Sequence, residues 1–417
     1  MVSEAAGRNW AGNVGYGAAG LVRPRSLDEL REVVASARRV RALGSRHTFT
    51  DLADTDGLLV TLDALADPAQ VTVQDGVATV PSGIRHGELA TELRRHGVAL
   101  ANLASLPHIS VAGAVATGTH GSGDRIGTLA TQVRAVELIT AGGGTLRLTR
   151  SDADFAGAVV ALGALGIVTH LELDVEPDYR VAQRVFDRVR WSRALADFDT
   201  LTSAGDSVSL FTTWQDAETI DQVWVKTREG GEAPDLAAFG GVAADGPRHP
   251  IRGVDPTPAT EQGGVLGPWF ERLPHFRLAF TPSAGAELQS EYLLPRSEAP
   301  AAVEALQALA PRIAPLLLVT EVRTMAGDDL WLSGAHGAAT VGIHFTWKPD
   351  EPAVRALLPA IEAALPEAAR PHWGKVFELP GDALAERYPR WHDFAALRRR
   401  LDPDDVFGNA FLDRIGL

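Results

Sequence analysis

The chain has 417 residues, more than one hydrophobic core usually serves, so we expect two domains. Its formal net charge of −14 would repel phosphate backbones and anionic lipids, and no apolar run approaches the roughly 20 residues of a membrane span. Nucleic acids and membranes are therefore poor partners, and the absence of cysteine excludes disulfides, thiolate metal sites and cysteine nucleophiles.

The N-terminal part of the sequence predicts alternating helices and short strands. Ser26 and Glu29 form a capping-box pattern, and apolar residues at helical spacing follow them. We expect strands at about residues 39–43, 58–62, 71–73, 77–80 and 167–175, a hairpin at 133–140 and 145–149, and helices at 26–38, at 87–96 and from Ser151 onward. The first residues carry no secretory or lipidation signal, so we expect a cytoplasmic protein.

Pro177 marks the expected boundary between two domains, because longer strand and helix patterns follow it. We expect an α+β fold with a first domain at residues 1–178 and a second at 179–371. The loop-like segment 401–409 is expected to return to the first domain, which residues from about 372 to 417 complete. A Gly/Pro-rich stretch at 230–267 predicts surface loop. No obvious interface helix is present, so we expect a monomer.

Two short patterns suggest sites that their context argues against. Residues 15–20 match the G-x-G-x-x-G pattern of dinucleotide-binding folds, but no apolar strand precedes them and Pro24 follows where a helix should begin. His86 and Glu88 have the spacing of a zinc deaminase motif, but the cysteines that complete such a site are absent. We expect a turn at the first position and helix-surface residues at the second.

Two Gly-rich loops are the strongest candidates for a ligand site. Residues 43–49 (Leu-Gly-Ser-Arg-His-Thr-Phe) follow a predicted strand, so successive N–H groups can be exposed with His47 at the loop tip. Residues 105–123 consist mostly of small residues, which allow a backbone to approach a bulky ligand closely. Two such loops favour one long ligand, of the dinucleotide type; the alternative is two surface turns and a structural histidine.

The pair of loops resembles the vanillyl-alcohol oxidase family of flavoproteins, and most closely its alditol oxidase members. The resemblance continues through residues 161–167, 321–323, 344–347, 372–375 and 402–409, so it covers essentially the whole chain. It implies a two-domain fold in which an FAD-binding α+β domain carries a cap domain with an antiparallel sheet flanked by helices. It also implies that FAD is attached covalently through His47.

The resemblance also assigns roles to individual residues of this chain. It implies that the following residues line the FAD: Ala42, Leu43, Gly44, Ser45, Arg46, His47, Thr48, Ser105, Ser110, Gly113, Thr117, Gly118, Thr119, Ile167, His372 and Asn409. It implies that the substrate meets Ser105, Glu321, Arg323, Thr346 and Lys375.

The strand period supports part of this second group. Glu321 and Arg323 fall on one face directly after an apolar run, so they should pair or meet a polar ligand. A purely structural ion pair is the alternative. His344 and Thr346 likewise share a face, where a hydrogen-bonded core histidine is the alternative. Lys375 is notable because the chain uses arginine almost everywhere else, although a surface lysine would show the same pattern.

These expectations define a reaction. A terminal hydroxyl of an alditol such as xylitol, sorbitol or glycerol would be oxidised by hydride transfer to flavin N5, and dioxygen would be reduced to hydrogen peroxide. His344 or Lys375 would take the hydroxyl proton, and Arg323 or Lys375 would stabilise the reduced flavin. The alternatives are an aldonolactone oxidase or dehydrogenase, a flavin-binding protein without alcohol oxidation, and a nucleotide-binding regulator.

Overall fold

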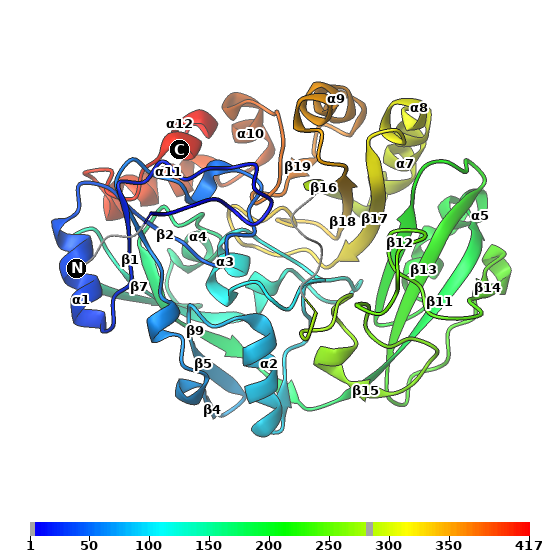
Figure 1. Cartoon of the computed structure of the whole chain (residues 1–417), viewed down its shortest axis with the longest axis horizontal. Coiled ribbons are helices and arrows are strands. Elements are labelled where there is room, and N and C mark those ends of the chain that lie inside the picture. Colours follow the sequence, from blue (N-terminus) through cyan, green and yellow to red (C-terminus); the bar gives the residue numbers. More distant parts are fainter. Residues whose placement is uncertain (1–4, 281–286) are drawn as a thin grey trace.

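The computed structural model describes residues 5–280 and 287–417. Figure 1 shows two parts side by side, one holding the N-terminal and C-terminal segments and the other built on the longest strands. The helices of the first part are α1 (Leu27–Ser36), α2 (His86–Arg95), α3 (Val111–Ala116), α4 (Phe155–Val159), α10 (Gly381–Arg387), α11 (Trp391–Leu401) and α12 (Ala410–Ile415). Those of the second part are α5 (Trp191–Ala196), α6 (Phe198–Thr202), α7 (Ala299–Ala308), α8 (Ala310–Ile313) and α9 (Glu351–Ala364).

The first part contains three small sheets. A parallel sheet has the strand order β1-β3-β2 and consists of β1 (Gly20–Val22), β3 (Leu58–Val60) and β2 (Val40–Ala42). An antiparallel sheet in the order β4-β5-β9-β7-β8 consists of β4 (Thr72–Gln74), β5 (Val77–Pro81), β9 (Ile167–Asp174), β7 (Val133–Ile139) and β8 (Thr145–Thr149). A third, short sheet pairs β6 (Val98–Ala99) with β10 (Glu176–Pro177).

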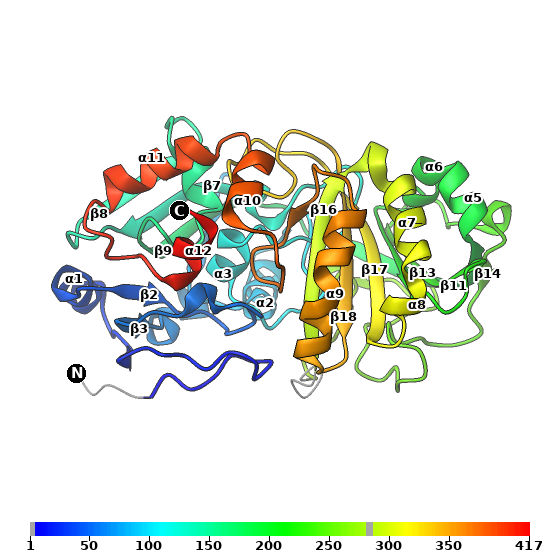
Figure 2. The ribbon, with the colours of Figure 1, turned by 90° about the horizontal axis from the view of Figure 1, so that it is seen from above.

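The second part is built on one large antiparallel sheet in the order β14-β11-β13-β12-β17-β18-β16-β19, with β15 paired to β11. Its strands are β11 (Arg180–Arg190), β12 (Ser207–Thr212), β13 (Thr219–Arg228), β14 (Val242–Ala243), β15 (Gly267–Pro268), β16 (Leu288–Pro295), β17 (Leu317–Met325), β18 (Thr340–Trp347) and β19 (Arg370–Pro371). Helices α7 and α9 run along one side of this sheet in Figure 2, and their apolar residues share a core with β16, β17 and β18. The opposite face borders a cavity at β16, β17 and β18, and carries a second apolar cluster at β11, β12 and β13.

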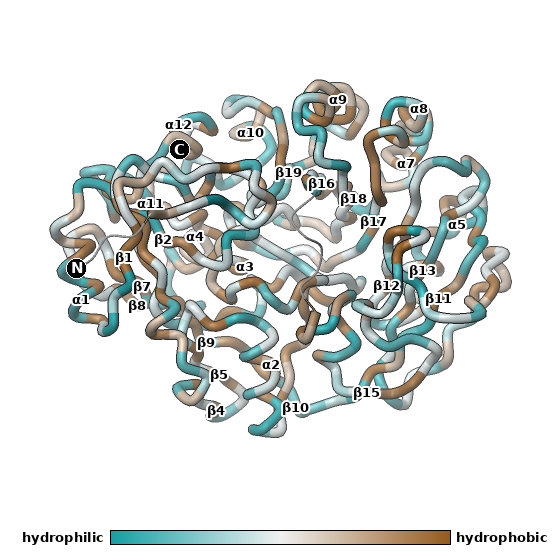
Figure 3. The backbone as a smooth tube through the Cα atoms, viewed as in Figure 1, coloured by the Kyte–Doolittle hydropathy of each residue, from teal (hydrophilic) through white to brown (hydrophobic). Residues whose placement is uncertain are grey.

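This architecture confirms the expected two-domain α+β fold. Apart from the helix expected from Ser151, the predicted elements of the first part lie within one or two residues of the observed ones, and the strand carrying Glu321 and Arg323 is β17. Segment 230–267 contains only short elements, as expected for a loop. Figure 3 shows polar and apolar residues alternating along the outer helices, and the buried residues of α1, α9 and α11 recur at helical spacing. None of the helices in residues 5–280 and 287–417 is long and apolar enough to cross a membrane.

Three local predictions were wrong. Ser151 does not cap a helix: its hydroxyl bonds to Thr149 Oγ1 at 2.8 Å, Asp152 closes a turn on the Thr149 N–H, and α4 begins at Phe155. These local side-chain bonds compete with helix initiation. His86 is not a surface residue either, because its side chain is buried at the start of α2, while Glu88 is exposed. Residues 15–20 lead into β1 and not into a helix, as predicted, but they form an irregular segment and not the expected turn.

The C-terminal segment returns to the first part and fixes the strand that leads into the first loop. Arg41, which is 2% exposed, donates hydrogen bonds to the carbonyls of Leu52, Leu162, Gly163 and Phe407. The neighbouring Val40 N–H donates to the Val406 carbonyl at 2.8 Å. Three segments distant in sequence are thereby tied to one buried side chain beside β2.

Candidate active site

A cavity of about 640 Å³ lies between the loops of the first part and the open face of the large sheet. Its volume is in the usual range for cofactor and substrate sites. It is lined by most of the residues predicted from the sequence: Ala42, Leu43, Gly44, Ser45, Arg46, His47, Thr48, Ser105, Ser110, Gly113, Thr117, Thr119, Glu321, Arg323, His344, Thr346, His372 and Lys375.

Three predicted residues, Gly118, Ile167 and Asn409, are not part of this lining. The Asn409 side chain instead caps α12 by accepting from the Leu412 N–H and donates to the Leu52 and Asp54 carbonyls. Asn409 therefore links α12 to the segment that follows the first loop. Gly166 and Val168 line the cavity on either side of Ile167.

The two Gly-rich loops are tied together side by side. The Ser110 N–H donates to Ser45 Oγ at 3.0 Å, and the Ser45 N–H points at Ser110 Oγ at 3.4 Å. A Cβ atom on Gly44 would lie 2.5 Å from Ser110 Oγ, and one on Gly113 would lie 2.8 Å from the same oxygen. Glycine at position 44 therefore allows the first loop to approach the second closely, and glycine at position 113 leaves room for Ser110 within the second loop. Both loops line the cavity, and together they form its loop wall.

His47 lies on this wall with its ring stacked on Trp10 at a centroid distance of 5.5 Å. Arg46, the residue before it, has a φ of 64°, and its guanidinium bonds to the Ala6 carbonyl. Burial lowers the pKa of His47 to about 4, so its imidazole is neutral at neutral pH. A neutral imidazole lining a cavity has a nitrogen lone pair available for bonding.

The opposite wall contains a buried carboxylate that the sequence analysis missed. Glu291 on β16 lies 2.7 Å from Lys375 Nζ, 2.9 Å from Arg323 Nη2 and 3.1 Å from His120 Nε2. Burial alone would raise the pKa of Glu291, but Lys375, His120 and Arg323 outweigh it and hold that pKa well below its usual range. Glu291 is therefore an anion that fixes two of the predicted substrate-binding cations.

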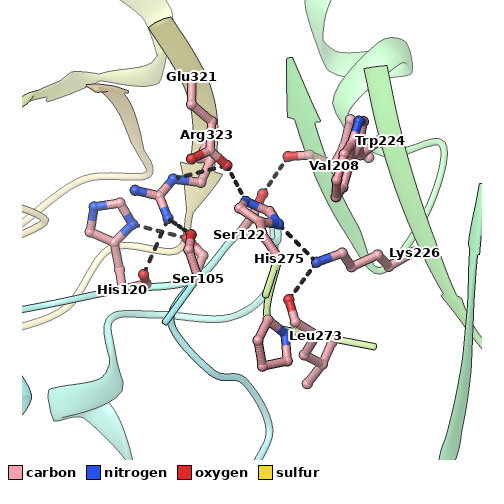
Figure 4. A network of polar contacts seen from close by, with 12 residues as sticks. Ser105, His120, Ser122, Val208, Trp224, Lys226, Leu273, His275, Glu321 and Arg323 are labelled. Carbon is pink, nitrogen blue, oxygen red and sulfur yellow. Dashed lines mark hydrogen bonds and ion pairs between the residues drawn. The ribbon is translucent and has the colours of Figure 1, made fainter. Parts of the chain in front are cut away.

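Glu321 and Arg323 point from β17 into the same cavity, as the strand period predicted. Glu321 Oε1 lies 3.5 Å from Arg323 Nε and 2.7 Å from His275 Nε2. Burial alone would raise the pKa of Glu321, but the neighbouring Arg323 and His275 outweigh this effect. The pKa is therefore below its usual value, and the carboxylate is ionised. Arg323 Nη1 also donates to Ser105 Oγ at 3.3 Å, which joins the second loop to the sheet (Figure 4).

His344 and Lys375 differ in charge state. His344 lies opposite Glu321 in the β17–β18 register, and no described residue bonds to its buried Nε2. Burial, and then the charge of Lys375, hold the pKa of His344 well below its ordinary value, so this imidazole is neutral. Burial also lowers the pKa of Lys375, but its ion pair with Glu291 opposes that shift and favours the charged amine. Thr346 lines the cavity two residues further along β18.

Comparison with known proteins identifies the family. Residues 18–149 match the family described as FAD binding domain, and residues 286–415 match D-arabinono-1,4-lactone oxidase. The chain is 49% identical to an alditol oxidase from Streptomyces sp. over 410 residues, which cover 97% of each chain. It belongs to the vanillyl-alcohol oxidase family of FAD flavoproteins.

Other relatives of this flavoprotein are more distant. It is 30% identical to an L-gulono-1,4-lactone dehydrogenase from Mycobacterium tuberculosis, over 98% of each chain, and 26% identical to an L-gulonolactone oxidase from Bos taurus. The crystal structure of a cholesterol oxidase from B. sterolicum superimposes with a TM-score of 0.77 at 14% identity, over 99% of this chain and 96% of that one. This last likeness shows the shared fold alone.

The cavity suits FAD, the cofactor of the family. A side chain at Gly44 or Gly113 would collide with Ser110, so the loop wall is shaped to bring bare backbone to a ligand. The cavity then continues to a sheet wall that holds two anions, two cations and a neutral imidazole. A long ligand can lie along the loops while a polar molecule meets the charged groups.

The sequence analysis missed Glu291, His120, His275 and Lys226, all of them buried. Lys226 follows the apolar run 223–225 of its strand, which is the same signal that indicated Glu321. Glu291 gives no such signal, because Gln289 and Ser290 precede it in β16. His275 carries no such signal, because it follows a proline in a segment without regular structure.

Proposed function

We propose that this flavoprotein oxidises the terminal hydroxyl of alditols, such as xylitol, sorbitol or glycerol, to the aldose. The observation that carries the proposal is the sheet wall, where the acceptor Glu321 lies beside the donors Arg323 and Ser105. A chain of hydroxyl groups both donates and accepts, so it can satisfy such a wall. The identity with the Streptomyces alditol oxidase supports the same substrate class.

The chain's own residues divide the work of the reaction. When bound, FAD supplies the acceptor for the hydride of the alcohol carbon, and dioxygen then takes up the electrons as hydrogen peroxide. His344 takes the hydroxyl proton, because its buried imidazole is neutral and its Nε2 has no described partner. Lys375 stays protonated against Glu291, so it and Arg323 provide fixed positive charge on the sheet wall.

The covalent link through His47 is part of the proposal. His47 lines the loop wall, its neutral imidazole has a lone pair, and stacking on Trp10 restricts its ring. His47→Ala should abolish attachment and leave some noncovalent binding. Acid precipitation tests this: the flavin should stay with the wild-type pellet and appear in the supernatant of His47→Ala. Flavin released from the wild-type protein would contradict the link.

The domain limits are also proposed: residues 1–178 with about 372–417 bind FAD, and residues 179–371 form the cap. The large sheet, which begins at β11 and ends at β19, supports these limits. Some cap segments nevertheless pack into the core of the first part: Leu330, Trp331 and Leu332 do so, and so do Val181, Trp269 and Leu273.

The decisive experiment is anaerobic mixing of the purified holoprotein with xylitol while the visible spectrum is recorded, followed by admission of air and a peroxide assay. Bleaching of the yellow band and its return with peroxide are expected. A second candidate, an aldonolactone oxidase or dehydrogenase, is favoured by the family match at residues 286–415. L-gulono-1,4-lactone tests it in the same cell. Bleaching by the lactone and not by xylitol would overturn the alditol proposal.

A further inference from the structure

A buried lysine lies behind the sheet wall and does not line the cavity. Lys226 on β13 is 1% exposed and is absent from the cavity lining. Its Nζ donates to the Leu273 carbonyl and lies 3.3 Å from His275 Nδ1 (Figure 4). A fully buried lysine is costly unless it is paired, so its retention here needs an explanation.

His275 connects this lysine to the cavity. Its Nε2 lies 2.7 Å from Glu321 Oε1, and its ring is held edge-on between Phe211 and Trp224 at centroid distances of 5.4 Å. Its backbone N–H donates to the Ser105 carbonyl at 3.1 Å, so the same residue also contacts the second loop. The imidazole therefore has little freedom to rotate or shift.

The chemistry of the two neighbours fixes the tautomer of His275. Burial lowers the pKa of Lys226 to about 7, but its amine can donate a hydrogen bond in either charge state, so His275 Nδ1 is the acceptor. An ionised carboxylate only accepts, so His275 Nε2 carries the hydrogen and donates it to Glu321. Both requirements lead to the same neutral tautomer, and burial lowers the pKa of His275 to about 4, which agrees with a neutral ring.

We propose that Lys226 and His275 are positioning residues that orient Glu321 for hydroxyl recognition. Lys226 holds the imidazole, and the imidazole occupies Glu321 Oε1. Among the described residues, none donates a hydrogen bond to Glu321 Oε2, so this oxygen is left to accept from the substrate. The inference rests on the proposed alditol function, because it assigns Glu321 the task of binding a substrate hydroxyl.

This arrangement predicts an effect on binding rather than on the chemical step. If Lys226 is replaced by methionine, His275 Nδ1 loses its donor and the ring is no longer held from behind. Glu321 then loses its fixed orientation while Arg323, His344 and Lys375 keep their own contacts. Substrate affinity should fall, and the rate at saturation should change little.

The first test is Lys226→Met in the holoenzyme, assayed for peroxide with xylitol. KM should rise by about 10- to 100-fold, the range for a hydrogen bond to a charged group, while kcat stays within about 3-fold. Lys226→Arg, which retains a donor, should recover part of the loss. Lys348→Met is the matched control, because Lys348 also donates to a backbone carbonyl, that of Pro315, but is exposed. Its KM should equal that of the wild type.

A double-mutant cycle separates positioning from general support of the fold. In a Glu321→Gln background, Lys226→Met should raise KM by less than about 3-fold, because the group it orients has already changed. An undiminished effect in that background would overturn the proposal, as would a KM for Lys226→Met within 2-fold of the wild type at equal flavin content.

A measurement that does not depend on turnover tests the positioning role even if Lys226→Met does not fold or the protein does not oxidise alditols. The ¹⁵N NMR spectrum of histidine-labelled wild-type holoprotein, with His275 assigned by its loss in His275→Gln, should show a protonated Nε2 and a bare Nδ1 at pH 7. A proton on Nδ1 would overturn the positioning role, even if Lys226→Met fails to fold. A wild type that leaves xylitol unchanged but shows the expected tautomer would refute the alditol proposal alone.

Discussion

The two walls of the cavity are built in opposite ways. The loop wall uses contiguous residues, small side chains and backbone, and its shape depends on how closely Gly44 approaches Ser110. The sheet wall uses charged side chains from β16, β17 and the loop after β19, and its shape depends on charge pairing at Glu291. We therefore expect added side-chain volume to impair the loop wall, and removal of charge to impair the sheet wall.

The largest effect is expected from Glu291→Gln, which removes charge without changing size. Lys375 and Arg323 would lose a buried anionic partner, an effect of about 3–5 kcal/mol when one member of a buried pair is lost. We expect kcat/KM to fall by about 100-fold or more, together with a lower Tm. Peroxide assay and thermal denaturation measure both.

The control for this variant is Glu362→Gln. Glu362 accepts from Tyr292 Oη and from the Glu378 N–H, each at 2.8 Å, and does not line the cavity. It should leave kcat/KM within about 3-fold of the wild type. Equal losses in both variants would mean that Glu291 has no special place in the sheet wall.

The next effect is expected from Gly44→Ala, which adds volume without charge. The new Cβ would lie 2.5 Å from Ser110 Oγ, so either the Ser110 hydroxyl turns away and loses its contact with the Ser45 N–H, or the loops separate. Flavin content after purification should drop by about 10-fold, the cost of roughly 1–3 kcal/mol of overpacking. Ser110→Ala in the same chain removes that oxygen and leaves a Cβ distance of 3.6 Å, so the double variant should regain flavin. Continued flavin loss in the double variant would argue against the steric reason.

A smaller effect, on the free energy of unfolding, is expected when the pH is lowered. In protein without attached flavin, burial lowers the pKa of His47 to about 4 and that of His372 to about 3, whereas the unfolded chain takes up these protons near pH 6.5. The unfolded state then binds more protons between pH 6.5 and 4, so the free energy of unfolding falls as pH falls through this window. Each histidine contributes at most about 1.4 kcal/mol per pH unit.

Urea titrations at several pH values measure this slope. Replacing His372 by asparagine should reduce it by about one proton between pH 6 and 4.5. An exposed histidine, His392 on α11, gives the matched control, and His392→Asn should leave the slope unchanged. A wild-type protein whose stability is flat between pH 7 and 4 would show that these imidazoles are already charged when folded.

The smallest effect is expected from Thr346→Val, which keeps shape and removes one hydroxyl from the sheet wall. KM for xylitol should rise by about 2- to 10-fold with kcat little changed, as for one neutral hydrogen bond. Thr227→Val on β13, which is buried outside the cavity lining, is the comparison. A KM that does not move would exclude Thr346 from substrate contact.

The two walls also differ in how much of each could be predicted from the sequence. The two loops were predictable as a ligand site because each is a single stretch whose composition indicates close backbone approach, whereas the individual residues that line the site came from the family resemblance. Glu321 and Arg323 were predictable because a strand alternates faces. The Glu291–Lys375 pair was not, because its members lie 84 positions apart and meet only when β16 packs beside the loop after β19. Ser151 failed for a local reason, a side-chain turn that competes with helix capping.

The hydrogen bonds of Val40 and Arg41 to the C-terminal segment bear on when, during synthesis, the first loop can fold. The loop that begins after β2 cannot take its final form until residues 406 and 407 are available to accept from Val40 and Arg41. During synthesis these residues emerge long after residue 47, so flavin capture must await almost the whole chain. We therefore expect an N-terminal segment still bound to the ribosome to hold no flavin, and the cofactor to bind only after residues 406 and 407 have been made.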